Sequence, residues 1–404
     1  MALVRPFRAL RPPPSLAASV ASPPYDVINT AEARALAAGN PVSFLRVSRP
    51  EIDLPPGTDE HDDAVYAKGA ENLARFLADG TLVEDPAPSL YLYRQTMGAH
   101  AQVGVVGCVS VDEYVNDTIR KHERTRADKE DDRTRHIDAL GAHDEPVFLA
   151  YRADPAIDAR VARAITAAPA YDFVTADGVG HTLWTLSTEE SAALAREFAR
   201  VPLLYVADGH HRSAASARMH ARRAGTPGEH DVFLAVLFPH DQLQILPYNR
   251  LVRDRAGRSP AEVLAALREV FDVREGEATI PLSPRVFHAF LGGRWYRLAV
   301  REGSYDARDP VASLDAQLCQ DLCLGPIFGI TDPRKDKDVD FVGGIRGLAE
   351  LERRVRDEGW TLAIALHPTR IDDVLAVSDA GAIMPPKSTW FEPKLRSGLF
   401  VHRV

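Results

Sequence analysis

The chain has 404 residues, which is enough for two ordinary domains or for one large domain with insertions. Its 48 Lys and Arg stand against 57 Asp and Glu, a formal net charge of −9. Proteins that bind nucleic acid or anionic lipid without sequence preference are usually basic. We therefore expect no nucleic-acid partner and no membrane partner, and any phosphate that the protein binds must meet a local site.

The three cysteines are too few and too scattered for a disulfide framework, and we interpret them as buried thiols. The first 16 residues lack the apolar segment of a signal peptide. No stretch of the sequence approaches the roughly 20 apolar residues of a membrane span. These features predict a cytoplasmic protein and leave open whether it forms a homodimer.

In the first half of the chain, prolines interrupt short apolar runs over the first 60 residues, which predicts an irregular segment. A helix is predicted over 62–79, where apolar residues recur at helical spacing and Asp-Gly ends the run. Strands at 90–93 and 103–111 form a predicted hairpin. Beyond the highly charged segment 120–136, the predicted elements are a buried strand at 147–151, a helix at 156–168 and strands near Phe173 and Leu183.

In the second half, the patterns predict helices over 188–200, from 210 to about 223, over 260–270, near 313–323 and around 371–377. Strands are predicted at 203–206, 295–300 and 361–366, and at 232–238 and 243–246, which form an apparent hairpin. Because helices and strands are mixed rather than strictly alternating, the pattern favours an α+β fold with mixed sheets and packed helices. We predict a phosphate-binding core over 1–255 and an α+β region over 256–404 that completes the site.

The sequence Asp-Gly-His-His-Arg, which begins at Asp208, stands where a buried strand turns into a helix. The first amides of a helix have no intrahelical partner, and the helix dipole makes that end electropositive, so the turn favours an anion. Gly209 lets a phosphate approach the backbone, Arg212 offers a planar set of donors, and His210 and His211 can donate hydrogen bonds or exchange protons. Alternatively, Asp208 is the N-cap of the helix and accepts the same amides. The clustered ionisable groups favour the anion site.

Residues 206–212, Val-Ala-Asp-Gly-His-His-Arg, resemble the signature of the bacterial domain of unknown function 1015. That family is similar to the ParB/sulfiredoxin-like superfamily, which includes free serine kinases. Further motifs extend the resemblance along almost the whole chain: Ser-Pro-Pro-Tyr-Asp-Val-Ile at 22–28, Asn-Pro-Val-Ser-Phe-Leu-Arg at 40–46, Lys-His-Glu-Arg-Thr at 121–125, Asp-Gly-Val-Gly-His at 177–181 and the tail at 384–394. The sequence departs from the family pattern at Asn249, where a His usually precedes the Arg.

The resemblance implies a ParB/serine-kinase-like core in which the Gly-His-His-Arg element cradles the phosphates of a donor and Asp208 helps to place metal or substrate. It also implies that a carboxylate from an earlier segment takes the proton of the substrate hydroxyl. The candidate for this base is Glu123, with His122 beside it, and Lys121 can neutralise donor phosphates. Alternatively, the segment is a solvated helix face with ion pairs, which is the interpretation that we prefer beyond Arg126.

Five further residues are expected to support the site. Asp26 either steadies a ligand or caps the next helix, and Arg46 either clamps a carboxylate or phosphate or pairs with a surface acid. In the tail, cations and hydroxyls stand beside prolines that stiffen the loop. This arrangement favours a phosphate-side role for Lys387, Ser388 and Lys394.

The sequence contains neither a Gly-x-x-x-x-Gly-Lys-Ser/Thr loop nor the protein-kinase catalytic set, and His-x-x-x-His spacing is absent around His210. From the resemblance we expect a small-molecule phosphotransferase that uses ATP, ADP or pyrophosphate, with Mg²⁺, to phosphorylate free L-serine. The alternative is a regulator that binds nucleotide without turnover, as ParB-type proteins do. We find no convincing helix-turn-helix or basic DNA-reading segment, and the net charge favours the enzyme.

Overall fold

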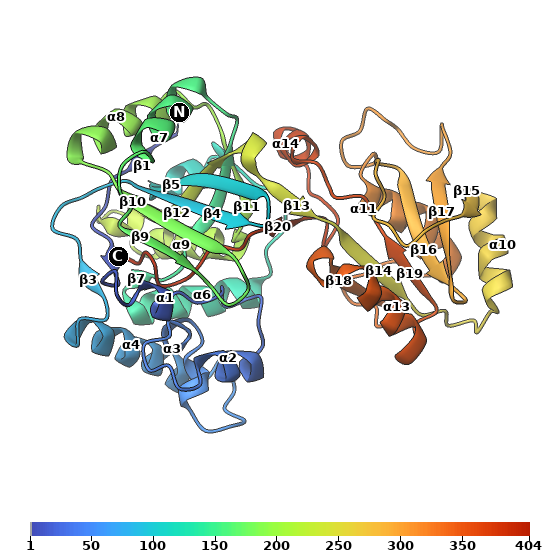
Figure 1. Cartoon of the computed structure of the whole chain (residues 1–404), viewed down its shortest axis with the longest axis horizontal. Coiled ribbons are helices and arrows are strands. Elements are labelled where there is room, and N and C mark those ends of the chain that lie inside the picture. Colours follow the sequence, from blue (N-terminus) through green and yellow to red (C-terminus); the bar gives the residue numbers. More distant parts are fainter. Residues whose placement is uncertain (1) are drawn as a thin grey trace. The chain divides into compact units, whose positions relative to one another are not determined.

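The computed structural model describes residues 2–404, which divide into two compact units. The first unit runs to Leu243 and includes Pro393–Val404, and the second is Gln244–Glu392. Each unit has its own main sheet and its own apolar core (Figure 1). The predicted α+β class, with mixed sheets and packed helices, is confirmed. The division into functional domains at 1–255 and 256–404 stays a prediction.

The main sheet of the first unit has nine strands. Their order is β6 (Ile119–Arg120), β11 (Leu204–Asp208), β8 (Val147–Tyr151), β12 (Val232–Pro239), β5 (His100–Ser110), β4 (Tyr91–Met97), β10 (Gly180–Thr185) and β9 (Tyr171–Val174), with β1 (Val4–Arg5) paired to β5. The pairs β6–β11 and β8–β12 are parallel, whereas β11–β8 is antiparallel. The carboxyl ends of β6 and β11 therefore meet the amino end of β8 at one edge of the sheet.

Helices lie on both sides of this sheet. α7 (Pro155–Ala164) and α8 (Thr188–Phe198) bury apolar side chains against it, whereas α6 (Ala127–Leu140) packs against α9 (His210–Arg222) and against α4 (Asp63–Ala78). In Figure 1, α7 and α8 lie on the opposite side of the sheet from α4 and α6. The shorter elements are α5 (Val111–Val115), η2 (Glu229–Asp231), η3 (His240–Gln242), β2 (Leu10–Arg11), β3 (Val83–Glu84), β7 (Ala142–His143) and β21 (His402–Arg403).

The first 60 residues contain helices, so the prediction of an irregular segment was wrong. α2 (Thr30–Ala37) starts with a capping box, in which Asn29 and Glu32 each accept the other's backbone N–H. The other helices of this segment are α1 (Ala17–Val20), α3 (Leu45–Ser48) and η1 (Pro50–Asp53). The prolines stand between these helices or at the start of one, where they are compatible with helical structure.

Two other predictions needed correction. The strand β13 (Gln244–Leu246) does not form a hairpin with β12 but pairs with β20 (Trp390–Glu392), because β5 and β8 already occupy both edges of β12. The segment beyond Arg126 is a helix, but its charged side chains are not all solvated. Asp132 and Arg133 are buried in α6, where they pair at 2.7 Å.

The second unit is built on a six-stranded antiparallel sheet. Its order is β15 (Phe271–Glu275), β17 (Arg294–Val300), β16 (Val286–Leu291), β19 (Leu362–Ala365), β14 (Tyr248–Val252) and β18 (Val339–Gly343). The helices are α10 (Pro260–Val270), α11 (Asp315–Cys319), the π-helix η4 (Gln320–Leu324), α12 (Gly325–Phe328), η5 (Gly344–Arg346), α13 (Gly347–Asp357) and α14 (Ile371–Asp379). All three cysteines of the chain are free and buried, as predicted.

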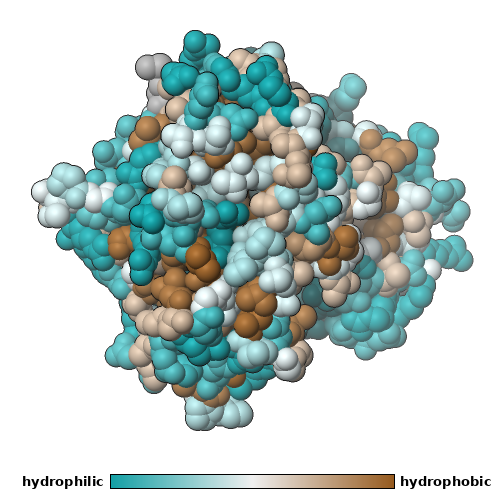
Figure 2. Space-filling model, turned by 60° about the vertical axis from the view of Figure 1, so that its left-hand side comes forward, coloured by the Kyte–Doolittle hydropathy of each residue, from teal (hydrophilic) through white to brown (hydrophobic). Residues whose placement is uncertain are grey.

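The surface shown in Figure 2 is mostly hydrophilic, and its hydrophobic side chains occur in separate groups rather than as one continuous patch. Scattered exposed apolar residues are normal for a folded protein. Within residues 2–404, none of the helices combines the length and the apolar character that crossing a membrane requires.

Candidate functional site

Two of the predicted motifs meet at the edge of the first sheet. β6 and β11 are parallel neighbours, with Leu204 opposite Ile119, so the residues that follow each strand lie side by side. The ring of His122 packs edge to face against the ring of His210, with centroids 4.6 Å apart and an interplanar angle of 85°. Both side chains are buried. The fold therefore joins the Lys-His-Glu motif to the Asp-Gly-His-His-Arg motif.

The helix α9 begins without a side-chain cap. Its N-cap position is Gly209, with φ 91°, and no side chain accepts a hydrogen bond from the first turn. The pairing of β11 with β8 shifts register between Val206 and Asp208, just before the turn. Asp208 does not cap the helix, and its carboxylate instead lies 3.5 Å from Lys394 Nζ and 3.6 Å from Arg212 Nη2. The first turn of α9 therefore has no capping side chain, although the Asp208 carboxylate lies beside it.

The guanidinium of Arg212 folds back under Gly209. A Cβ atom at Gly209 would lie 3.0–3.1 Å from guanidinium atoms, and the φ of 91° also favours glycine at this position. Arg212 Nη1 donates to the Pro146 carbonyl at 2.6 Å and lies 3.6 Å from Glu145 Oε2. Burial disfavours the charged form of Arg212, but the charges of Glu145, Asp26 and Asp208 outweigh it and raise the pKa. The guanidinium is thus held between two carboxylates.

Glu145 is a residue of this cluster that the sequence analysis did not identify. Its Oε1 accepts hydrogen bonds from the Tyr25 amide at 3.0 Å and from the Ser397 hydroxyl at 2.7 Å. Burial raises the pKa of Glu145 to about 7, although the nearby Arg212 lowers it. The sequence signal was weak: a glutamate and a proline before a buried strand. It becomes informative only when β8 is known to run antiparallel to β11.

Several buried polar atoms of the cluster have no hydrogen-bond partner in the part of the chain that the structure describes. They are both ring nitrogens of His122, Nε2 of His210, Nε of Arg212 and Oε2 of Glu145. Leaving such atoms unpaired typically costs about 1–3 kcal/mol each, so a native protein seldom keeps several together without a reason. Burial lowers the pKa of His122 to about 4 and that of His210 well below its ordinary value. Both rings are therefore neutral at pH 7, and each can offer one donor and one acceptor.

The C-terminal segment brings Lys394 to the cluster. The side-chain amide of Gln95 donates to the Lys394 carbonyl at 2.8 Å. The Asp208 side chain is 28% exposed and that of Lys394 is 17% exposed, so the pair borders on solvent. Burial opposes the charge of Asp208, but Lys394 and Arg212 outweigh it and hold the pKa of the carboxyl below its usual range. Lys394, one of the tail residues predicted for the site, therefore lies beside Asp208.

His211 connects α9 to the loop that follows β6. The Arg126 amide donates to His211 Nε2 at 3.2 Å, and burial lowers the pKa of the imidazole. Glu123 lies in this loop and is exposed. Lys121 instead pairs with Asp117 at 2.7 Å, and its ammonium donates to the Tyr114 carbonyl at 2.9 Å. The Lys121 ammonium therefore interacts with α5 and with the turn that follows it.

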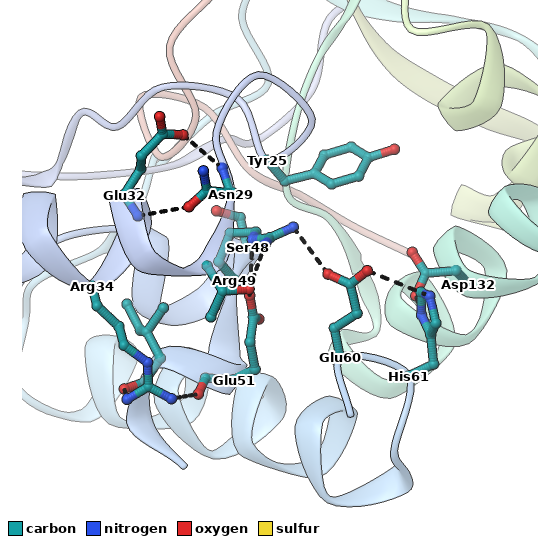
Figure 3. Close-up of polar contacts among 12 residues, drawn as sticks. Tyr25, Asn29, Glu32, Arg34, Ser48, Arg49, Glu51, Glu60, His61 and Asp132 are labelled. Atoms are coloured by element: carbon teal, nitrogen blue, oxygen red, sulfur yellow. Dashed lines mark hydrogen bonds and ion pairs between the residues drawn. The ribbon is translucent and has the colours of Figure 1, made fainter. Parts of the chain in front are cut away.

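Asp26 lies near the cluster: its charge contributes to the raised pKa of Arg212 and offsets part of the lowering of the His211 pKa by burial. The neighbouring Tyr25 ring lies 3.9 Å from the guanidinium carbon of Arg133 in α6. Figure 3 shows the polar contacts of this N-terminal segment. They include His61 with Asp132 at 2.9 Å, and Arg49 with Glu51 and Glu60. The contact between His61 and Asp132 fastens the segment to α6, and Tyr25 is held by Arg133 and by the hydrogen bond of its amide to Glu145.

The other three predicted site residues have partners elsewhere. Arg46 pairs with Asp53 and donates to the carbonyls of Asn40 and Ala37. In the second unit, Lys387 lies over the Tyr248 ring, with Nζ 5.5 Å from its centroid. The Ser388 hydroxyl donates to the Pro385 carbonyl at 2.7 Å. Arg46 is therefore engaged within its own segment rather than in the cluster around Asp208. The role predicted for Lys387 and Ser388, which belong to the second unit, stays a prediction.

A small cavity lies behind the cluster. It has a volume of about 10 Å³, which is room for about one water molecule. Its lining residues come from the N-terminal segment, α6, β7, β8, α9 and β12, and the polar ones include Tyr25, Arg133, His143, Glu145, Arg212 and Ser216. Cations, neutral imidazoles and an uncapped helix start thus surround the Asp208 carboxylate. Such an arrangement can bind a phosphate-sized anion.

Comparison with known proteins gives a family and a distant structural likeness. No curated protein matches the sequence significantly. The solved structures that resemble the chain include a free serine kinase variant in complex with ADP, at 13% identity and a TM-score of 0.35, covering 71% of this chain and 87% of that chain. SbnI from Staphylococcus aureus, with a C-terminal truncation, matches at 10% identity and a TM-score of 0.37, covering 74% and 87%.

A conserved hypothetical protein from Pyrococcus furiosus matches at 12% identity and a TM-score of 0.35, covering 74% of this chain and 95% of that chain. At these TM-scores the likeness assigns no activity to the chain. The sequence match is more specific, because residues 4–317 fit the model of one family. The chain therefore belongs to the family described as protein of unknown function (DUF1015).

Proposed function

We propose that this protein is a small-molecule phosphotransferase that binds the phosphates of a donor at the start of α9. The acceptor would be the hydroxyl of free L-serine, and the donor ATP, ADP or pyrophosphate. The observation that carries the proposal is the set of buried polar atoms without hydrogen-bond partners around the uncapped start of α9, next to Arg212 and Lys394. A phosphate would accept hydrogen bonds from the donors among these atoms and from the two cationic side chains.

In this proposal the donor phosphates occupy the first turn of α9. The amides of His210 to Arg212 would donate to the phosphate oxygens, together with the Arg212 guanidinium and the Lys394 ammonium. Because burial keeps His210 neutral, its ring would contribute a hydrogen bond rather than a charge. Phosphoryl transfer depends mainly on such positioning and on neutralising charge, which is the kind of catalysis that a rigid cationic turn supplies.

The proposed base is Glu123. It is exposed in the loop that follows β6, one residue after the His122 ring that contacts His210. The loop is also tied to the first turn of α9 by the hydrogen bond from the Arg126 amide to His211. The Glu123 carboxylate would take the hydroxyl proton while the serine oxygen bonds to the terminal phosphorus of the donor. The bond from that phosphorus to the bridging oxygen breaks, and ADP, AMP or phosphate leaves.

In this proposal, Mg²⁺ binds together with the phosphate donor rather than to the protein alone. Asp208 offers a partly exposed carboxylate, but Lys394 and Arg212 lie 3.5 and 3.6 Å from it, and these charges would repel a free divalent cation. Mg²⁺ typically binds through one or two carboxylates together with substrate phosphates. When bound, it would neutralise charge on the donor. We therefore expect Mg²⁺ to bind with the donor and not before it.

The test is to incubate the purified full-length chain with L-serine, Mg²⁺ and each donor, and to measure O-phosphoserine. Glu123→Gln should abolish turnover while donor binding, measured by calorimetry, persists. Glu189→Gln, an exposed glutamate at the start of α8, is the matched control and should behave like the wild type. Donor binding without product from any hydroxy amino acid would contradict the enzyme and favour the nucleotide-binding regulator.

A further inference from the structure

A second group of ionisable side chains lies at the opposite end of α9 from the candidate site. His220 is in the last turn of α9, and His230 and Asp231 belong to η2, which leads into β12. One ligand atom from each of these three residues lies within 4.8 Å of the other two. We propose that His220, His230 and Asp231 bind a divalent late first-row metal ion such as Zn²⁺.

The distances suit a tetrahedral ion. Asp231 Oδ1 lies 3.0 Å from His220 Nδ1 and 3.6 Å from His230 Nε2. Ligand atoms bound to zinc at about 2.0–2.1 Å in tetrahedral geometry lie about 3.4 Å from one another. The two distances stand on either side of this value. The nitrogens of His220 and His230 lie within 4.8 Å of each other, so binding one ion requires all three atoms to settle near the tetrahedral spacing.

The environment of His230 is an independent indication of a ligand. Its side chain is 8% exposed, and Nε2 is buried without a hydrogen-bond partner among the described residues. The ring lies against Gly228, where an added Cβ atom would be 2.9 Å from ring atoms. A buried, unpaired imidazole nitrogen that faces a carboxylate oxygen is suited to bind a metal.

Two further contacts resemble the outer shell of a metal site. Asp112 Oδ1 lies 3.3 Å from His220 Nε2, the nitrogen on the far side of the ring from Asp231. Histidines that bind metals commonly donate their other N–H to a carboxylate in this way, which fixes the ring and its tautomer. The Gly228 amide donates to Asp231 Oδ2 at 3.0 Å, which orients the carboxylate and leaves Oδ1 toward the two histidines.

The ligand set indicates which metals should bind. Two imidazoles and one carboxylate favour Zn²⁺, Co²⁺ or Ni²⁺, whereas Mg²⁺ prefers oxygen ligands in octahedral geometry. Three protein ligands leave one position of a tetrahedron for solvent. The site is separate from the proposed phosphate site, so its failure or success does not depend on phosphotransfer.

The test uses the full-length chain without a polyhistidine tag, freed of metal with a chelator and dialysed. Co²⁺ should bind at one ion per chain and give the intense visible d–d absorption of a tetrahedral site, and Zn²⁺ should displace it and raise the melting temperature. His230→Gln and Asp231→Asn should each weaken binding by at least about tenfold, and Asp112→Asn by about tenfold with unchanged stoichiometry. His100→Gln, a half-buried histidine of β5, is the control and should bind as the wild type does.

Folding is checked by comparing the melting temperatures of the metal-free variants with that of the metal-free wild type. If His230→Gln does not fold, Asp231→Asn and Asp112→Asn carry the same prediction. The proposal is overturned if the wild type binds no stoichiometric Co²⁺ or Zn²⁺, or if folded variants at these positions bind as tightly as the wild type.

Discussion

The imidazole of His122 stands edge-on to the imidazole of His210, and neither nitrogen of the His122 ring has a hydrogen-bond partner among residues 2–404. His122 lies in the loop that follows β6, and His210 is the first residue of α9, which follows the neighbouring parallel strand β11. Both rings are buried beside the start of α9. Protonating either imidazole would therefore place a positive charge where water solvates it poorly.

Protonation of His122 should destabilise the fold in mild acid. Burial lowers its pKa to about 4, below the value of about 6.5 in an unfolded chain. Below pH 6.5 the unfolded state therefore binds more protons, and stability falls as pH drops toward 4. Between pH 6.5 and 5, the His122→Gln variant should lose about 1.5 kcal/mol less unfolding free energy than the wild type does.

Denaturant unfolding at the two pH values measures this difference. His100→Gln is the control, because it removes a histidine from the same unit, and it should lose as much stability in acid as the wild type. If His122→Gln and the wild type lose the same unfolding free energy between pH 6.5 and 5, protonation of His122 does not cause the loss of stability in acid.

The hydrogen bond from the Arg126 amide to His211 Nε2 should order the loop that carries Glu123. His211→Ala removes the acceptor, so amides 121–126 should exchange with deuterium faster, while exchange in β11 stays as in the wild type. Hydrogen–deuterium exchange with mass spectrometry resolves the two segments. If phosphotransfer is the function, turnover should fall more than donor affinity, because the amides at the start of α9 are left in place.

The regular elements could be predicted because they are determined by short stretches of sequence. The strand 147–151 is a continuous apolar run, and the helix 260–270 starts with Ser259 and Glu262 in a capping box. Both match the structure residue for residue. The helix α2 has a capping box of the same kind, but the surrounding prolines concealed it. Proline was treated as a sign of irregular structure, whereas here it separates short helices.

The composition of the candidate site depended on strand order, which the sequence does not display. Glu145 reaches Arg212 because β8 runs antiparallel to β11, and His122 reaches His210 because β6 runs parallel to it. Lys121 was expected beside the phosphates, but Asp117, which has a φ of 63°, lies close enough to pair with it. Side chains that follow one another along a loop point to different places, and spacing alone does not reveal which one faces the site.

Removing the charge of Glu145 should strengthen anion binding. Its Oε2 lies 3.6 Å from Arg212, so the ionised carboxylate competes with a bound anion for the guanidinium. With a pKa of about 7, Glu145 becomes neutral as pH falls from 8 to 6, and wild-type affinity for pyrophosphate should rise over this range. Glu145→Gln should bind about tenfold more tightly at pH 8 and lose this part of the pH dependence.

Calorimetric titration of both proteins at pH 6 and 8 makes the comparison, and the titration of pyrophosphate itself cancels between them. Glu197→Gln is a matched control, since Glu197 pairs with Arg160 in α8 and α7, away from the start of α9. Weaker binding by Glu145→Gln at both pH values would mean that the carboxylate positions Arg212 for the anion more than it competes with it.

Alanine at Gly209 should affect both stability and anion binding, and the chain contains a position that separates the two effects. Gly209 and Gly225 share a left-handed backbone, with φ values of 91° and 87°. A Cβ atom at Gly225 would have nothing within 4 Å, whereas one at Gly209 would press on the Arg212 guanidinium. Gly225→Ala should therefore lower the free energy of unfolding only by the backbone strain, about 1–2 kcal/mol, and leave pyrophosphate affinity unchanged.

Gly209→Ala should lower the free energy of unfolding at least as much and should also weaken pyrophosphate binding by displacing Arg212. Equal pyrophosphate affinities in the two variants, both folded by circular dichroism, would show that the contact between Gly209 and Arg212 does not shape an anion site.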